Sequence, residues 1–208
     1  METNEKIIQM CKDQIQKEAD ALLKIKDQVD DAYVEACKAI MDCKGRVVIT
    51  GLGKTGHIGK KIAASMASLG IPAFFVHSCE SLHGDMGMIT PEDVVIMISN
   101  SGKSGEILNM LPPLKIIGAK TISITRDTSS PLAQGTDIKI LCAAGPEIDS
   151  NGLAPTSSST AALAIGDALA TVVSELRGFE KKDFALRHPG GALGQQLLKE
   201  YQAQVSAK

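Results

Sequence analysis

The sequence predicts an α/β protein: a doubly wound, five-stranded parallel sheet flanked by helices, with an N-terminal helical hairpin. Five short runs rich in β-branched residues follow Gly45, and helical stretches separate them. Short, largely apolar runs of this kind are typical of parallel strands buried on both faces. Repeated strand–helix–strand units build such sheets because their crossover helices cover both faces.

The first 44 residues are predicted to be helical. Between residues 7 and 41, apolar side chains recur every three or four positions among charged ones. No glycine or proline precedes Gly45, so the segment is expected to form an antiparallel helical hairpin. Its apolar stripe needs cover from the body of the domain and from a second subunit.

The α/β core is expected over residues 45–198. Strands are predicted at 46–50, 73–77, 94–99, 121–125 and 138–142. Helices are predicted at 56–69, 104–117, 129–134 and 156–176, with a loop-rich stretch at 78–88 and a short polar tail after Gly194. Since no linker, repeat or low-complexity tract is evident, residues 1–208 are expected to form a single domain.

Composition argues against several classes of protein. The chain carries 22 Lys and Arg against 24 Asp and Glu, and only 3% of its residues are aromatic. Such a chain offers neither a basic surface nor stacking platforms, so no nucleic-acid partner is expected. Apolar runs fall short of the roughly 20 residues of a membrane span, and the N-terminus lacks a signal-peptide pattern. The protein is therefore expected in the cytoplasm, without a membrane partner.

Segments that leave the predicted strands carry the candidate site, because open α/β sheets bind ligands beyond the carboxyl ends of their strands. Residues 51–59, after the first strand, contain the spacing G-x-G-x-x-G of dinucleotide sites. Lys54 and His57 inside this loop are atypical, so a nicotinamide is the weaker interpretation. The same glycines permit close approach of the backbone to a phosphorylated ligand.

A cluster of hydroxyl groups follows the third strand. Ser99, Ser101 and Ser104 surround the turn residue Gly102 just before a predicted helix. Ordinary helix capping explains one serine, whereas several hydroxyls beside free helix-start amides can bind a phosphate. Thr156 opens a second hydroxyl cluster at the start of the long predicted helix. Two such helix starts are expected to converge on one ligand.

Titratable residues near these clusters indicate proton transfer. The candidates are Lys54 in the glycine-rich loop, Glu106 after the serines, Glu147 after the fifth strand and His188 in a proline–glycine loop. An ammonium, two carboxylates and an imidazole beside a phosphate site suit proton transfer on a phosphorylated substrate.

Two further histidines are expected at the same edge of the sheet. His77 ends the second predicted strand, and His83 follows six residues later. Two imidazoles without an evident third ligand indicate a metal only weakly. The five cysteines include no C-x-x-C pair, so they are expected to be reduced thiols.

Taken together, these motifs resemble the SIS (sugar isomerase) domain, most closely that of the arabinose-5-phosphate isomerase family, in a short form without CBS domains. The blocks that carry the resemblance are GLGKTGHIG at 51–59, HGDMGM at 83–88, ISNSG at 98–102, GLAPTSS at 152–158, GDALA at 166–170 and DFALRHPGGALG at 183–194. They follow one another over most of the chain. The resemblance implies an SIS-type sheet.

A reaction and its catalytic set are implied by the resemblance. The family interconverts D-ribulose 5-phosphate and D-arabinose 5-phosphate through a cis-enediol, and the aldose feeds synthesis of Kdo and surface polysaccharide. Its catalytic residues correspond to Lys54, Glu106, Glu147 and His188. Either glutamate is a candidate for the base, and Lys54 would stabilise charge on the enediolate oxygens. His188 would reach the site of a neighbouring subunit.

The resemblance also implies how the substrate is held. Contacts with the phosphate or the sugar are implied for Ser99, Ser101, Ser104, Thr156, His77 and His83. His77 corresponds to a position that can hold zinc, but the mechanism requires no cofactor. The protein is expected to be a homotetramer or a dimer whose active sites are shared between subunits.

Departures from the family pattern leave alternatives open. Lys103 and Gly105 replace a Glu and a Ser of the serine loop, and Ser78 and Cys79 replace a Pro and a Gly. These positions border the sugar site, so an isomerase of another phosphosugar is one alternative. A non-catalytic phosphosugar-binding SIS module is the other, although such a module would not need the complete catalytic set.

Overall fold

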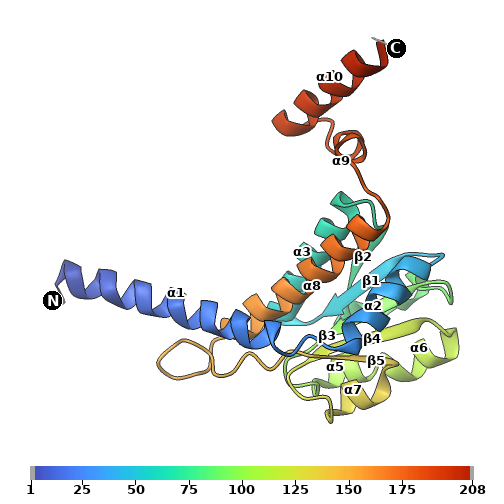
Figure 1. Ribbon diagram of the computed structural model, residues 1–208. Coiled ribbons are helices and arrows are strands. Elements are labelled where there is room, and N and C mark those ends of the chain that lie inside the picture. The colour runs from blue at the N-terminus through green and yellow to red at the C-terminus, as the bar shows by residue number, and fades with distance from the viewer. Residues whose placement is uncertain (1–2, 207–208) are drawn as a thin grey trace.

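A parallel sheet of five strands forms the centre of the α/β body (Figure 1). The computed structural model describes residues 3–206, so residues 1–2 and 207–208 of the predicted single domain lie outside it. The strands are β1 (Val47–Gly51), β2 (Ala73–His77), β3 (Val94–Ile98), β4 (Lys120–Thr125) and β5 (Ile138–Leu141), in the order β2-β1-β3-β4-β5. The predicted fold class is confirmed, and every predicted strand ends within one residue of the observed one.

The order of the strands determines where a ligand can bind. β1 pairs with β2 on one side and with β3 on the other, and Gly51 lies opposite Ile98 at the carboxyl ends. The chain therefore leaves β1 and β3 at neighbouring positions and moves toward opposite parts of the sheet. Such a reversal opens a crevice at the carboxyl edge of an α/β sheet.

Helices cover both faces of the sheet (Figure 1). On one face, α3 (Gly53–Ser68) and α8 (Ser157–Leu176) pack against each other and bury Val47 and Ile49 of β1. On the other, α5 (Gly105–Leu108), α6 (Leu111–Ile117) and α7 (Pro131–Gly135) cover Val48. Because successive strand residues point to opposite faces, a strand covered on both faces is buried along its whole length, as β1 and β3 are.

Two regions of short helices differ from the predictions. The predicted helix 104–117 is divided into α5 and α6, because Pro112 and Pro113 have no N–H to continue an α-helical ladder and occupy the start of α6 instead. The stretch predicted to be loop-rich contains α4 (Ser78–Ser81) and the 3-10 turn η1 (Asp85–Met88). Both regions lie on connections at the carboxyl edge.

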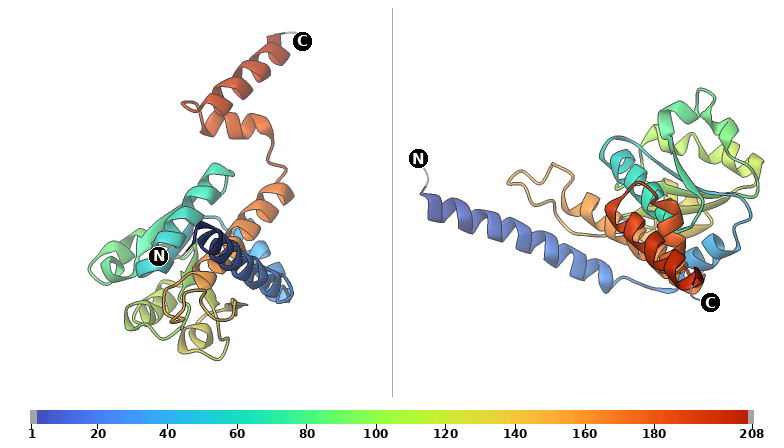
Figure 2. Two further views of the ribbon diagram at one scale, coloured as in Figure 1. Left: turned by 90° about the vertical axis from the view of Figure 1, so that its left-hand side faces the viewer. Right: turned by 90° about the horizontal axis from the view of Figure 1, so that it is seen from above.

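The two N-terminal helices are present, but the predicted antiparallel hairpin is wrong. Asp30 caps the start of α2 (Asp31–Asp42), and α1 (Asn4–Lys26) runs away from it (Figure 2). Both helices pack on α8, where Ala21 and Ile25 at the end of α1 are buried. The Ala-rich surface of α8 accepts both apolar faces, so the helices bury against it rather than against each other.

Helix α8 is the centre of this helical layer. Among residues 3–206 it is the single helix whose length and apolar composition would suffice to cross a membrane. Its residues Ala161, Ile165, Leu169 and Val173 are buried, and α1, α2 and α3 all pack on it. This is the environment of a core helix in a globular domain.

The polar tail predicted after Gly194 is helical in the structure. After α9 (Lys181–Arg187), helix α10 (Ala192–Ser206) begins and packs against α9, and the pair projects from the body (Figures 1 and 2). Leu, Gln, Glu and Ala are strong helix formers, so a polar composition did not exclude a helix. A Cβ at Gly194 would overlap the carbonyl of His188, so this turn requires glycine.

Candidate active site

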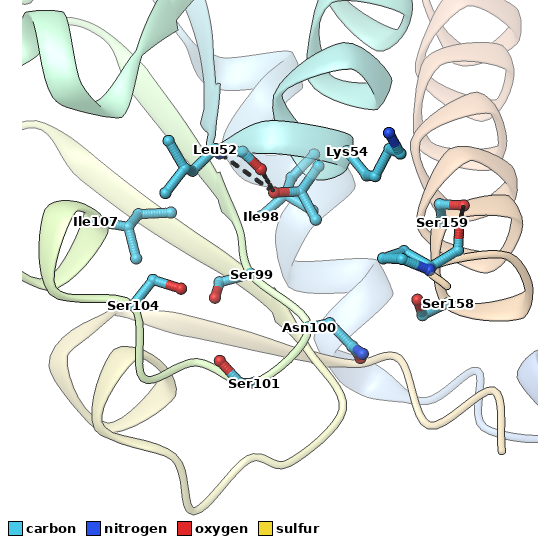
Figure 3. Close-up of a pocket in the computed structure, with 12 residues that line it drawn as sticks. Leu52, Lys54, Ile98, Ser99, Asn100, Ser101, Ser104, Ile107, Ser158 and Ser159 are labelled. Carbon is cyan, nitrogen blue, oxygen red and sulfur yellow. Dashed lines mark hydrogen bonds between the residues drawn. The ribbon is translucent and has the colours of Figure 1, made fainter. Parts of the chain in front are cut away.

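A pocket of about 260 Å³ lies in the crevice beyond the carboxyl ends of β1 and β3 (Figure 3). Three segments form it: the start of α3, the loop between β3 and α5, and the start of α8. Its lining residues are Leu52, Lys54, Thr55, Ile98, Ser99, Asn100, Ser101, Ser104, Ile107, Pro155, Ser158 and Ser159. The structure thus brings together four residues of the predicted site: Lys54 and the three serines of the loop after β3.

The glycine-rich turn after β1 places Lys54. Thr55 Oγ1 accepts a hydrogen bond from Leu52 N (3.2 Å) and donates one to Leu52 O (2.8 Å), which closes the turn into α3. A Cβ at Gly51 would lie 3.0 Å from the carbonyl of Thr55, so the close approach of strand and helix needs glycine there. Lys54 is the exposed second residue of α3 and extends toward α8 (Figure 3).

The loop after β3 directs three hydroxyl groups toward one space (Figure 3). Ser99 is buried and its Oγ accepts from Gly102 N at 3.2 Å, while Ser101 Oγ accepts from Lys103 N at 3.2 Å. Ser104 precedes α5, and in the described part of the chain its hydroxyl makes no hydrogen bond to that helix. These hydroxyls can still donate to an anion, because an acceptor role leaves the O–H free.

Glu106 and Glu147 lie on different segments, and neither lines the pocket. Glu106 is half-buried in the first turn of α5, between the lining residues Ser104 and Ile107. Glu147 is half-buried in the long loop between β5 and α8. Its Oε2 accepts hydrogen bonds from Thr156 N (2.8 Å), Thr156 Oγ1 (3.1 Å) and Ser158 N (3.2 Å).

These contacts keep Glu147 ionised. Burial alone would raise the pKa of its carboxyl group, but the hydrogen bonds from Ser158 and Thr156 outweigh that effect and lower the pKa below its ordinary value. The carboxylate also lies at the positive end of α8. Glu147 is therefore a carboxylate, not a carboxylic acid, at neutral pH.

The second hydroxyl cluster differs in detail from its prediction. Thr156 Oγ1 contacts Glu147 and accepts from Ile148 N at 3.1 Å, so this hydroxyl is directed at the Glu147 loop. Ser158 and Ser159 line the pocket instead. The run of hydroxyl residues at 156–160 predicts a hydroxyl cluster in the sequence. Which of these residues face the pocket depends on the position of the first turn of α8.

His77 and His83 lie at the same edge of the sheet, outside the pocket lining. His77 Nδ1 accepts from Cys79 N at 3.3 Å and caps α4, while His83 is exposed in the turn that follows α4. No group of three His, Cys, Asp or Glu side chains that could hold a metal ion occurs among the described residues. The groups around His77 in one chain therefore do not fit a zinc ion.

His188 lies far from Lys54 in the same chain. Its Nε2 is 2.7 Å from Ser68 Oγ, its Nδ1 is 2.9 Å from Phe184 O, and its ring stacks on Phe184. A carbonyl only accepts, so Nδ1 donates to Phe184 O, and Nε2 shares a hydrogen bond with the Ser68 hydroxyl. Ser68 ends the helix that begins next to Lys54, and the two are about 21 Å apart at 1.5 Å per residue.

Comparison with known proteins identifies the family of the chain. Residues 39–172 match the family described as SIS domain. The chain is 50% identical over 181 residues to the arabinose 5-phosphate isomerase KdsD of Pseudomonas aeruginosa, covering 87% of this chain and 56% of that protein. For KdsD of Escherichia coli K12 the identity is 49%, covering 87% and 55%. The chain thus spans a little over half the length of these curated relatives.

A solved structure extends the match to three dimensions. The structure of E. coli CFT073 c3406 in complex with arabinose 5-phosphate has a TM-score of 0.88 and 43% sequence identity to this chain, covering 90% of this chain and all of that one. Sequence and fold therefore agree over most of the chain. The family match spans well over half of the residues, and the chain belongs to the SIS-domain family.

Proposed function

We propose that the protein interconverts D-ribulose 5-phosphate and D-arabinose 5-phosphate through a cis-enediol. The observation that carries this proposal is the pocket in which Lys54 and the hydroxyls of Ser99, Ser101 and Ser104 converge. It occurs in a chain whose relatives of about 50% identity are named arabinose 5-phosphate isomerase. The aldose would feed synthesis of Kdo and surface polysaccharide in the cytoplasm.

The chemistry needs a base, a charge stabiliser and a phosphate anchor. A glutamate, Glu106 or Glu147, takes a proton from C1 of ribulose 5-phosphate, and the C1–H electron pair becomes the C1–C2 double bond. The carbonyl oxygen at C2 gains the negative charge, which the Lys54 ammonium stabilises. Transfer of the O1 proton to O2 and return of a proton to C2 give the aldehyde at C1 and the C2 hydroxyl of arabinose 5-phosphate.

Isomerisation in heavy water tests the proposal. The purified protein, treated with a chelator, is incubated with ribulose 5-phosphate, and the product is followed by proton NMR. Arabinose 5-phosphate carrying deuterium at C2 is the expected result, because the enediol takes its proton from solvent-exchanged groups. A different labelled aldose from a panel of ketose phosphates would identify another phosphosugar isomerase. No turnover of any sugar, with binding retained, would identify a binding module.

Replacing Ser101 by alanine is expected to weaken phosphate binding. One hydrogen bond to a charged group contributes about 1.5–3 kcal/mol, which corresponds to a tenfold to hundredfold rise in the inhibition constant of inorganic phosphate. The matched control is Ser129→Ala, whose hydroxyl contacts Asp127 outside the pocket lining. Equal inhibition constants for the two variants would contradict a phosphate role for the serine loop.

We further propose that the protein self-associates and that each active site takes His188 from a second copy. The separation of His188 from Lys54 supports this, since one chain cannot supply both groups to one substrate. The start of α1 also projects from the body with apolar side chains exposed, among them Ile15, which is 71% exposed (Figure 2). Most helices in proteins are stabilised by the packing of an apolar face, so a second copy is expected to cover it.

A groove between α2 and α8 offers the complementary surface. It has a volume of about 510 Å³. Its lining consists of Val29, Tyr33, Val34, Cys37, Lys38, Met41, Ala168, Leu169, Val172 and Leu176. One chain thus presents both exposed apolar side chains on the start of α1 and an apolar groove between α2 and α8. A symmetric dimer or tetramer can satisfy both, because each copy gives and receives the same contact.

Subunit complementation tests the shared site. Lys54→Ala and His188→Ala variants are expected to be nearly inactive alone, and a mixture that has been dissociated and reassembled is expected to recover up to about a quarter of wild-type activity. Half of randomly formed dimers are mixed, and each mixed dimer carries one intact and one doubly altered site. No recovery from a mixture that forms mixed dimers would show that Lys54 and His188 do not share a site.

A further inference from the structure

We infer that Gln28 is a positioning residue for the loop that carries Glu147, an inference that rests on the proposed function. Gln28 lies between α1 and α2, and its amide holds both backbone groups of Ala143. Nε2 donates to Ala143 O at 3.0 Å, and Oε1 accepts from Ala143 N at 3.0 Å. This two-bond pattern is the one by which a neighbouring strand would hold the backbone.

Ala143 is the point at which the chain leaves the sheet. Cys142 N still donates to Thr125 O of β4 at 2.7 Å, and β5 is the edge strand. Beyond Ala143 no further strand is present to continue the ladder in the described sheet. The Gln28 amide therefore extends the ordered backbone by one residue, at the start of the Glu147 loop.

The loop is held at both ends of a short span. Gln28 fixes Ala143, and four residues later the Glu147 carboxylate is bonded to the start of α8. Between them, Gly145 has a φ of +96° and faces α1, since a Cβ there would lie 3.3 Å from Lys24 Nζ. The end of α1 and its linker thus form the surface against which this loop lies.

Loss of the Gln28 amide would release one end of that span. The backbone before Glu147 would gain conformations, so its carboxylate would spend less time in the productive position. Displacement of a reacting group by about 1 Å can cost a hundredfold in rate. The serine loop that would hold the phosphate leaves a different strand, β3, and has no hydrogen bond to Gln28 among the described residues. Turnover should therefore change more than binding.

Gln28→Met tests the inference, because methionine keeps the length of the side chain and removes its amide. We expect kcat to fall about tenfold with KM changed less than about twofold, and amide hydrogen exchange to accelerate at residues 143–147. Gln28→Glu keeps an acceptor for Ala143 N but places a carboxylate oxygen, which cannot donate, against Ala143 O. We therefore expect kcat to fall and hydrogen exchange to accelerate in this variant too. It provides a second test if the methionine variant folds poorly.

The matched control is Glu18→Met on the same segment. Glu18 Oε2 accepts from Thr160 Oγ1 at 3.0 Å, so this change removes a bond between α1 and α8 and leaves Ala143 held. If kcat falls equally in the control and in Gln28→Met, Gln28 has only a general role in packing α1, and the inference is overturned. An unchanged kcat in Gln28→Met would overturn it as well. A wild-type protein without isomerase activity would instead refute the proposed function, which the hydrogen-exchange readout does not require.

Discussion

Replacement of Glu106 or Glu147 by glutamine is expected to lower kcat by a factor of about 10² to 10⁴, the usual contribution of a general base. Glutamine keeps the size of the side chain and one acceptor oxygen. In Glu147→Gln this oxygen can still accept from Thr156 N and Ser158 N, so the start of α8 should keep its structure. KM should change little, because the serine loop is untouched.

Solvent exchange then identifies the base. Removal of the carbon-bound proton is the step that exchanges substrate hydrogen with heavy water, so the variant that loses both turnover and exchange has lost the base. A variant that loses turnover and keeps exchange has lost a group that moves the oxygen-bound protons or stabilises their charge. Near-wild-type kcat in both variants would contradict the enediol mechanism on these residues.

Replacement of Gly166 by valine is expected to destabilise the protein by about 3 kcal/mol, the upper range for overpacking a dense core. A Cβ at Gly166 of α8 would overlap side-chain atoms of Ile62 of α3, which is fully buried and cannot move into solvent. Thermal denaturation should show Tm lowered by roughly 6–12 °C for a domain of this size.

Gly166→Val is also expected to affect substrate binding, because α3 and α8 both carry residues of the pocket. The start of α3 bears Lys54 and the start of α8 bears Ser158, and both line the pocket. Forcing the helices apart at Gly166 should therefore raise KM at temperatures where the variant remains folded. Glu175→Val is the control, because it places valine at an exposed position of the same helix. Because valine is a better helix former than glycine, helix propensity cannot account for a loss of stability at Gly166. A loss in Gly166→Val no greater than in the control would contradict the packing explanation.

Local patterns in the amino-acid sequence were enough to predict the sheet, because a strand buried on both faces needs a short, continuous run of apolar residues between turn residues. The position of Lys54 followed as well, since the glycine-rich turn is a local feature, and so did the serine loop. Each depends on neighbours within a few residues. Hydrophobic runs and turn glycines act over that range, so these features can be read in order along the chain.

Contacts between segments far apart in the sequence are determined by the tertiary packing of the helices. The direction of α1 depends on the surface of α8, about 140 residues away, as the hydrogen bond from Thr160 to Glu18 illustrates. The choice of Ser158 over Thr156 for the pocket depends on the rotation of α8 on the sheet, and the placement of His188 beside Ser68 depends on how α9 leaves the body. Periodicity shows that a helix has an apolar face, but which surface buries that face is settled by the packing free energy of the whole domain.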